Sequence, residues 1–345
     1  MIGKRNDSMT TESRKISDSS LYYKIASILE ESRKFVATTV NTAMVQTYFE
    51  IGRLIVEEEQ HGNVRAEYGK ETLKNLSTKL TANYGKGFSQ RNLEQMRQFY
   101  LVYSAQIPQT PSAKFSLSYS HYLFLMRIDN PDERKFYEIE SSQNNWSLRE
   151  LKRQFDSALF ERLSLSKDKE KVKSLAVQGQ IIENPCDIVK DPYVLEFLGL
   201  PEKSHYSESE LESRLIEKLE TFLLELGKGY TFVGRQVRLS FDEKHFFVDL
   251  VFYNRLLQCF VLIDLKIGEL THQDLGQMQM YVNYYDRFVK LDHENKTIGI
   301  ILCKKKSDSL VEITLPEDNN QIFASKYQTV LPNKEDLIKL IQAED

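Results

Sequence analysis

Two acids and a lysine lie within the most apolar stretch of the chain, residues 246–266 (FFVDLVFYNRLLQCFVLIDLK). Asp249 interrupts the first apolar run, and Asp264 and Lys266 close the second. Charged side chains are rare in such runs unless they are paired or bind a metal ion. These three residues are therefore the first candidates for chemistry.

The alternation of side chains along a strand places these charges relative to one another. Residues two apart share a face, so Asp264 and Lys266 point the same way. By the same rule Asp249 shares a face with Phe247 and Val251. If the two runs pair as a hairpin, two carboxylates and one ammonium group converge at a sheet edge.

Two carboxylates at one point suit a hard divalent cation. Mg²⁺ takes oxygen ligands in octahedral geometry and keeps several waters. It polarises a phosphoryl oxygen and lowers the pKa of a bound water. A lysine beside it can orient that water or offset charge on a transition-state phosphate. The alternative is a structural ion pair between Lys266 and the acids, which is less favoured because buried pairs rarely add stability.

Helices on either side of these strands offer further groups. Glu212 continues the buried stripe of a helix expected over residues 207–226, so we predict it as a third acid on the metal side. Gln277 and Tyr281 lie one turn apart on a helix expected over residues 271–289, away from its core stripe. They could reach a phosphate or a base, or they could belong to an exposed polar face without function.

Length and composition indicate two domains in a chain of 345 residues. The net charge of −4 gives no global polybasic signal, so any nucleic-acid contact must be local. Three separated cysteines form no zinc spacing and suit a reducing cytosol, and no apolar run reaches membrane-spanning length. We expect a cytoplasmic protein with a disordered tail over residues 1–20, a helical domain over 21–165, a linker over 166–185 and a second domain over 186–345.

The helical domain contains a candidate DNA reader at residues 84–100 (YGKGFSQRNLEQMRQFY). Gly85 and Gly87 form a turn, and Ser89 is placed to cap the next helix. A helix, a glycine turn and a polar-faced helix outline a helix-turn-helix. A second basic helix follows Trp146, and the alternative for both is a solvated face of a helical bundle. The predicted nucleic-acid contacts of this domain are Arg91, Asn92, Arg97, Arg149, Lys152 and Arg153.

The second domain alternates strands and helices in the order α-β-β-β-α-β. Strands are expected over residues 230–240, 245–253, 258–266, 297–303 and about 323–331. The connection from residue 266 through a helix to residue 297 implies parallel pairing of the strands it joins. The overall class is thus α+β, with an all-α first domain and an α/β second domain.

These residues carry a resemblance to a known family. Asp249, Asp264 and Lys266 in this order of elements resemble the PD-(D/E)xK nuclease superfamily, and Gln277 with Tyr281 resembles the QxxxY motif of its RecB-like branch. Longer segments are similar to the YhcG-like nucleases of bacteria, and this similarity spans roughly residues 20–335. They are KDPYVLEFLGL (190–200), FLLELGKGYTFVGRQVRL (222–239), TIGIILC (297–303), YGKGFSQRNLEQMRQFY (84–100) and LSYSHYLFLMRI (117–128).

The resemblance implies a winged-helix-like N-terminal domain that binds DNA and a restriction-endonuclease-like domain that cuts it with Mg²⁺ or Mn²⁺. Asp249, Asp264 and Glu212 would hold the metal ion, Lys266 and Gln277 would act in catalysis, and Tyr281 would touch the nucleic acid. Val248 stands where relatives carry proline, and Asp264 where they often carry glutamate. The rival expectation is a non-catalytic DNA or partner reader, and a homodimer is among the expected assemblies.

Overall fold

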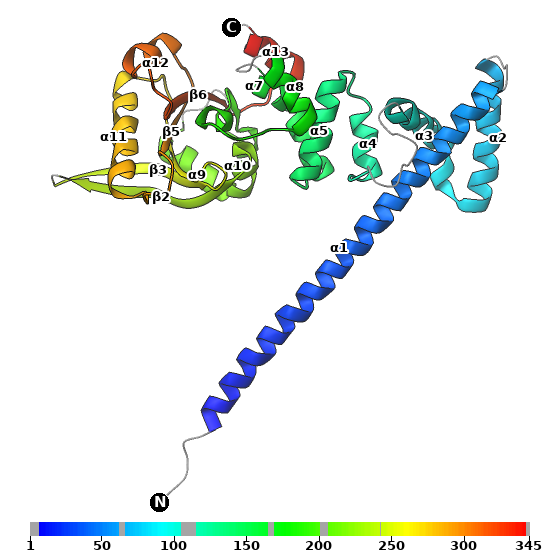
Figure 1. Cartoon of the computed structure of the whole chain (residues 1–345), viewed down its shortest axis with the longest axis horizontal. Coiled ribbons are helices and arrows are strands. Elements are labelled where there is room, and N and C mark those ends of the chain that lie inside the picture. Colours follow the sequence, from blue (N-terminus) through cyan, green and yellow to red (C-terminus); the bar gives the residue numbers. More distant parts are fainter. Residues whose placement is uncertain are drawn as a thin grey trace, which may run out of the picture. The chain divides into compact units, whose positions relative to one another are not determined.

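The computed structural model describes residues 7–61, 66–104, 115–164, 169–200, 206–241 and 243–342 (Figure 1). They form two compact units, residues 1–134 with 141–148 and residues 135–140 with 149–345. The first unit is helical and the second is built on a mixed sheet covered by helices. The predicted α+β class is confirmed. No described helix is both long and apolar enough to span a membrane.

The first unit begins with α1, a helix of 55 residues from Asp7 to His61. This stretch contains no proline and a single glycine, Gly52, so little in its sequence interrupts a helix. The structure thus differs from the expected disordered tail, since residues 7–20 are helical and residues 1–6 lie outside the described residues. The other helices of this unit are α2 (Ala66–Tyr84), α3 (Gln90–Tyr103), α4 (Tyr119–Leu125) and the start of α5 (Pro131–Gln143).

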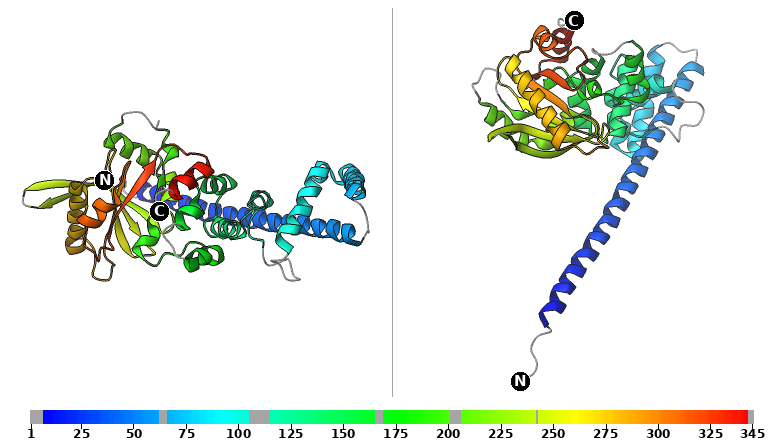
Figure 2. Two further views of the ribbon diagram at one scale, coloured as in Figure 1. Left: turned by 90° about the horizontal axis from the view of Figure 1, so that it is seen from above. Right: turned by 60° about the vertical axis from the view of Figure 1, so that its left-hand side comes forward.

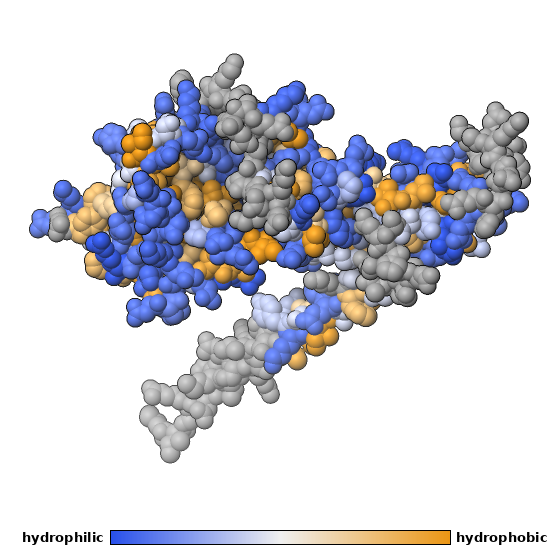
Figure 3. All heavy atoms as spheres, turned by 45° about the horizontal axis from the view of Figure 1, so that its top comes forward, coloured by the Kyte–Doolittle hydropathy of each residue, from blue (hydrophilic) through white to orange (hydrophobic). Residues whose placement is uncertain are grey.

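The second half of α1 packs closely on α3. A Cβ atom at Gly52 would lie 2.1 Å from the carbonyl oxygen of Met96, so only glycine permits this approach. Val45 and Phe49 are buried in the contact. Before this contact, the apolar side chains of Leu21, Ile25, Ile28 and Leu29 are exposed on α1 (Figure 3). In the second half of α1, Val36, Val40 and Leu54 are exposed as well, so its apolar residues are only partly buried.

The predicted helix-turn-helix is present as α2, a short 3-10 turn (Lys86–Phe88) and α3. Gly85 has φ 92°, a left-handed conformation that favours glycine, and the Ser89 hydroxyl caps α3 by accepting from the Asn92 N–H at 3.4 Å. The residues buried on α3 are Leu93, Met96, Phe99 and Tyr103. No strand occurs among residues 7–61, 66–104 and 115–148, so the wing of a winged helix remains a prediction.

A six-stranded sheet in the order β1-β6-β5-β4-β3-β2 forms the centre of the second unit. The four strands from β1 to β4 in this order are parallel, and β3 and β2 are antiparallel to their neighbours. α11 (His272–Phe288) joins β4 to the parallel β5, as predicted. The strands are β1 (Tyr193–Val194), β2 (Tyr230–Phe241), β3 (Lys244–Asn254), β4 (Cys259–Leu265), β5 (Ile298–Cys303) and β6 (Ile322–Gln328).

Helices cover both faces of this sheet, and each face has its own apolar cluster. α9 (Glu208–Glu217) and α10 (Leu219–Leu226) contribute Leu211, Leu215 and Phe222 to one cluster. α11 contributes Leu275, Met278, Val282 and Tyr285 to the other, with α12 (Asp308–Thr314) packed beside it. Figures 1 and 2 show α11 lying against the sheet and the β2–β3 hairpin extending beyond it.

The boundary between the units lies earlier than the predicted linker. From Arg149 onward, α6 (Leu148–Asp156), α7 (Leu159–Ser164) and α8 (Lys169–Gln178) belong to the second unit, and α13 (Lys334–Gln342) ends it. Within the expected linker, α8 is helical and buries Leu175 and Ala176. The high charge of this segment suggested exposure, but α8 buries one apolar side of its last turns.

Candidate active site

Asp249 and Asp264 lie on adjacent strands, where the β3–β4 pairing ends. The last paired residues are Leu250 and Ile263, one position short of both acids. Beyond that point the N–H of Leu265 donates to the Asp249 carboxylate Oδ2 at 2.8 Å. Asp264 is 2% exposed. The two acids thus come from neighbouring interior strands and not from an edge strand of the sheet, and their joint role stays a prediction.

The alternation of β3 is interrupted at Asp249. Val248 and Val251, three residues apart, pack in the same apolar cluster, whereas Phe247 is exposed. The expectation that Phe247, Asp249 and Val251 share one face is therefore wrong. The change of face falls between Val248 and Val251, beside the place where the pairing of β3 with β4 stops.

Gln236 of β2 links two of the predicted metal ligands. Its amide Nε2 donates to Glu212 Oε2 at 2.6 Å and to Asp249 Oδ1 at 2.9 Å. Its backbone has φ 48°, the left-handed region that a glutamine rarely adopts. A strained conformation of this kind persists where the surroundings fix it, often at functional sites. Sequence reasoning missed Gln236, since a glutamine within a strand carries no signal of its own.

Glu212 is placed by the apolar side of α9. Its neighbours Leu211 and Leu215 are fully buried, and Glu212 itself is buried beside them, as the helical stripe predicted. Burial raises the pKa of Glu212, Asp249 raises it further, and the hydrogen bond from Gln236 opposes both. Arg235 approaches the second carboxylate oxygen at 3.4 Å. Glu212 reaches Asp249 only through the amide of Gln236.

Lys266 forms an ion pair with Asp264, with Nζ 2.8 Å from Oδ2, and its ammonium group also lies 3.9 Å from Asp274 Oδ1. Burial would lower the pKa of Lys266, but Asp264 and the other acids raise it, so the lysine is charged. Burial raises the pKa of Asp264 to about 7, the nearby Asp249 raises it too, and Lys266 opposes the rise. Glu208, at the start of α9, acts weakly on both groups in the same sense as the other acids.

The Gln277–Tyr281 pair has a role that differs from the predicted one. The Gln277 amide bonds the Tyr281 hydroxyl, and this hydroxyl donates to the Phe247 carbonyl oxygen at 2.9 Å. Tyr281 is 1% exposed and belongs to the apolar cluster. It is therefore not available to stack on a nucleotide. The pair instead fastens α11 to β3 two residues before Asp249.

The three predicted nucleic-acid contacts on α3 differ in how far their side chains are available to a ligand. Arg91 is exposed. The Asn92 amide donates to the carbonyl of Gly87 at 3.0 Å and so holds the turn. Arg97 pairs with Glu59 of α1 at 2.7 Å, which neutralises much of its charge. Arg91 is consequently the member of this set that presents its charge to solvent.

The second basic set is divided in the same way. Arg149 and Lys152 are exposed on α6. Arg153 points inward, where it pairs with Glu196 at 2.7 Å and with the buried Glu225 at 3.3 Å. Its side chain is already committed to the interior of the second unit, so the expected contact of Arg153 with DNA does not agree with the structure.

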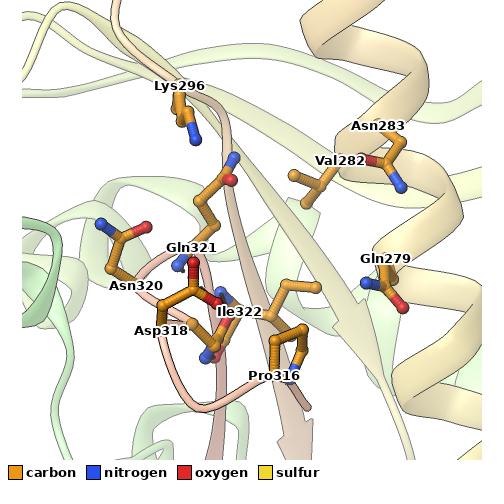
Figure 4. Close-up of a pocket in the computed structure, with 10 residues that line it drawn as sticks. Gln279, Val282, Asn283, Lys296, Pro316, Asp318, Asn320, Gln321 and Ile322 are labelled. Atoms are coloured by element: carbon orange, nitrogen blue, oxygen red, sulfur yellow. Dashed lines mark hydrogen bonds between the residues drawn. The ribbon is translucent and has the colours of Figure 1, made fainter.

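A small pocket lies at the end of the parallel strands opposite to Asp264, and the site acids do not line it. It measures ≈ 120 Å³ and lies beside α11, before the first residues of β5 and β6 (Figure 4). Lys296, Asn320 and Gln321 are among its lining residues, whereas Asp264 lies near the end of β4. Gln321 is held there by Asp286 and by the carbonyl of Thr297.

The acid pair fits a hydrated divalent cation better than a closed metal cage. Within the described part of the chain, no group of three or more His, Cys, Asp and Glu side chains is arranged to hold a metal ion. Mg²⁺, however, is commonly held by one or two carboxylates and several waters. A bound cation would reduce the electrostatic repulsion between the carboxylates of Asp249 and Asp264, so the two residues fit such an ion. The predicted third ligand, Glu212, is not brought to the pair, because the Gln236 amide stands between Glu212 and Asp249.

Comparison with known proteins decides the family. The model of the YhcG PDDEXK nuclease domain matches residues 186–342, and that of the DUF1016 N-terminal domain matches residues 24–162. A protein of Escherichia coli (strain K12) with the name "Putative nuclease YhcG" is 40% identical over 341 residues, covering 91% of this chain and 90% of its own. The chain belongs to the YhcG family.

The predicted resemblance is thereby confirmed, and the C-terminal half of this family member is a PDDEXK nuclease domain. The crystal structure of a repair endonuclease from Pyrococcus abyssi is 15% identical and covers 38% of this chain and 50% of its own. Its TM-score of 0.26 is too low to show a shared fold.

Proposed function

We propose that the chain is a metal-dependent DNA endonuclease in which Asp249 and Asp264 hold Mg²⁺ or Mn²⁺. One observation carries the proposal: two acids on adjacent strands meet where the pairing ends, with Lys266 2.8 Å from Asp264. In a member of the YhcG family this arrangement favours phosphodiester hydrolysis over a structural ion pair. A bound divalent ion would polarise the scissile phosphate and lower the pKa of an attacking water.

The residues around the acids have distinct tasks in this proposal. Lys266 stays charged beside Asp264 and offsets the negative charge that develops on the phosphate. The Leu265 N–H and the Gln236 amide hold the two oxygens of Asp249. Gln277 and Tyr281 do not touch the substrate in this proposal; they position β3 through the hydrogen bond from Tyr281 to the Phe247 carbonyl oxygen. Glu212 joins the metal side only if Gln236 releases it.

The helical domain targets the nuclease to DNA in this proposal. A capped helix that follows a glycine turn, with Arg91 exposed near its start, is the arrangement by which helix-turn-helix proteins reach DNA. Arg149 and Lys152, exposed on α6 of the second unit, would add phosphate contacts. Such contacts give affinity without sequence preference, so the proposal assigns no target sequence.

Two substitutions separate catalysis from metal binding. Lys266→Met keeps most of the side-chain stem and removes the charge, so we expect Mn²⁺ binding to persist and cleavage of plasmid DNA to fall by about two orders of magnitude or more. Asp249→Asn should lose Mn²⁺ binding and cleavage together. Calorimetric titration with Mn²⁺, thermal melts and a plasmid-nicking assay measure these effects.

The structural ion-pair alternative predicts another ranking. In that case Lys266→Met would leave two acids without a cation, lower the melting temperature and change no catalytic step. A stable Lys266→Met protein that binds Mn²⁺ and cuts at the parent rate would refute the catalytic assignment of the lysine. A parent protein that neither binds Mn²⁺ nor cuts any linear, branched or single-stranded substrate would refute the proposed function.

A further inference from the structure

We infer that the outer face of the β2–β3 hairpin is a binding track for a single-stranded or locally unpaired nucleic-acid segment that leads to the site acids. This inference rests on the proposed function and adds where the substrate strand lies and what form it has. The hairpin extends beyond the rest of the sheet in Figure 1. Its two faces differ sharply in burial and composition.

The inner face of the hairpin is part of the core. Leu239 and Val248 are buried in the cluster under α11, and Val237 and Phe246 pack against that cluster. Phe246 also stacks on Phe241, with ring centroids 5.1 Å apart. This face is therefore covered by the protein itself and leaves no room for a ligand.

The outer face carries an exposed aromatic ring next to an arginine. Arg238 and Phe247 are paired across the two strands, as are Ser240 and His245, so their side chains lie on the same face. Phe247 is 47% exposed, an unusual exposure for a phenylalanine in the middle of a strand. Toward the body of the sheet, the Gln236 amide of β2 donates to Asp249 Oδ1 of β3 at 2.9 Å. The track thus ends at a site acid.

The guanidinium group on this face is held in place by hydrogen bonds. Arg238 donates from Nε to Ser240 Oγ at 3.0 Å, and its Nη2 lies 2.9 Å from His245 Nε2. Its hydrogen bonds go to Ser240 and His245, and among the described residues Arg238 forms no ion pair with a carboxylate. An oriented guanidinium without a carboxylate partner suits a phosphate oxygen.

An exposed ring beside an oriented guanidinium group, close to the proposed phosphodiester-cutting site, matches the chemistry of single-strand binding. Such proteins pair a cationic path for the backbone with aromatic rings on which bases stack. Bases within a duplex are already stacked on one another and cannot cover a protein ring. Phe247 therefore selects a strand with an unpaired base, two residues along β3 from Asp249.

The test compares binding of the full chain to a labelled single-stranded oligonucleotide and to the same sequence as a duplex, by fluorescence anisotropy in EDTA so that nothing is cut. We expect Phe247→Ala and Phe247→Leu to weaken single-strand binding by about tenfold and Phe247→Trp to retain it. Duplex binding should change by less than about twofold for all three. Arg238→Gln should weaken binding and lower the salt slope by about one.

Matched controls come from exposed residues elsewhere in the same unit. Phe288 on α11 is 73% exposed, and Arg255 is exposed at the far end of β3. Phe288→Ala and Arg255→Gln should leave single-strand binding unchanged. Thermal melts of every variant identify any that fails to fold, and the Leu and Trp variants keep the position filled with an apolar side chain.

The outcomes distinguish this inference from the proposed function. Equal single-strand binding by the parent, Phe247→Ala and Arg238→Gln overturns the track even if the parent cuts DNA. An equal loss of duplex and single-strand binding in Phe247→Ala overturns the selection of unpaired bases. Selective loss of single-strand binding supports the track even if the parent shows neither Mn²⁺ binding nor cleavage, in which case the nuclease proposal alone fails.

Discussion

Arg162 should be essential to the stability of the second unit although it lies far from the acids along the chain. Its side chain is fully buried, with Nη1 2.7 Å from Glu225 Oε1 and 3.0 Å from the carbonyl of Pro192. Glu225 is also fully buried, and it is further paired with Arg153. Arg162→Met removes one charge and leaves the buried Glu225 with fewer compensating cations.

The magnitude follows from this burial. Removing one partner of a buried ion pair costs about 3–5 kcal/mol, because the remaining charge stays desolvated. Burial alone would raise the pKa of Glu225, but Arg162, Lys190 and Arg153 hold it at about 2. The difference from its ordinary value of 4.5 corresponds to about 3 kcal/mol at neutral pH. Because Arg153 and Lys190 share this effect with Arg162, we expect Arg162→Met to lose about 3 kcal/mol, the lower end of that range, which is still a large fraction of the stability of a typical domain.

The dependence on acid has a definite sign. The pKa of Glu225 is lower in the folded protein than in the unfolded chain. Its contribution is therefore complete above pH 4.5 and disappears as the pH falls to about 2. Glu225→Gln cannot titrate, so its stability should already be reduced at neutral pH and should show less of this acid-dependent loss.

Urea unfolding followed by circular dichroism measures these changes in the full chain. Arg149→Met is the matched control, because Arg149 is an exposed arginine on α6, and it should change stability by less than about 0.5 kcal/mol. The double variant Arg162→Met/Glu225→Gln should lose less than the sum of the single losses, since the charge that Arg162 compensates is gone. Equal unfolding curves for Arg162→Met and Arg149→Met would refute the reasoning.

Three further predictions concern the domain boundary, the site and the helical domain. The sequence alone predicts that residues 180–345 fold independently. The structure instead predicts that this fragment is poorly stable, because it lacks Arg153 and Arg162, and that residues 131–345 unfold cooperatively. Equal midpoints of urea unfolding for the two fragments would contradict this prediction. Because the pKa of Asp264 is raised to about 7 and only the ionised carboxylate binds a cation, Mn²⁺ affinity measured by calorimetry should fall by about tenfold per pH unit below pH 7 and level off above it. A Mn²⁺ affinity that does not depend on pH would exclude Asp264 as a ligand. Arg91→Glu should weaken duplex binding and flatten its salt dependence without changing the melting temperature. Arg97→Glu should also destabilise the protein, because it breaks the ion pair with Glu59. Unchanged duplex binding by Arg91→Glu would place the DNA contact elsewhere.

The sequence was informative where local patterns dictate structure. Apolar runs broken by turns predicted the strands from β2 to β5 with end points within about two residues, and helical spacing predicted the buried stripe of α11. The cap of α3 followed from Ser89 after two glycines. The acid pair was also predictable, because charges inside apolar strands stand out in a linear sequence.

The tertiary structure decided which partner each polar side chain has. Arg153 and Arg91 both read as basic residues on helices, but only packing shows that Arg153 is paired in the interior with Glu225. Tyr281 read as an exposed neighbour of Gln277, yet it is buried because β3 supplies a carbonyl for its hydroxyl. Such pairings join residues that are far apart in the chain, and the periodic spacing of apolar residues cannot predict them.

Gln236 illustrates the same limit within the site. A residue type carries little information when its function depends on a left-handed backbone and on two carboxylates from other elements. The sequence thus determined the elements, the acids and the lysine, since these follow from short-range patterns of polarity. The folded chain alone determined that an amide separates Glu212 from Asp249, and that Phe247 and Arg238 share the hairpin's exposed face, because strand register and helix docking are set by the whole core.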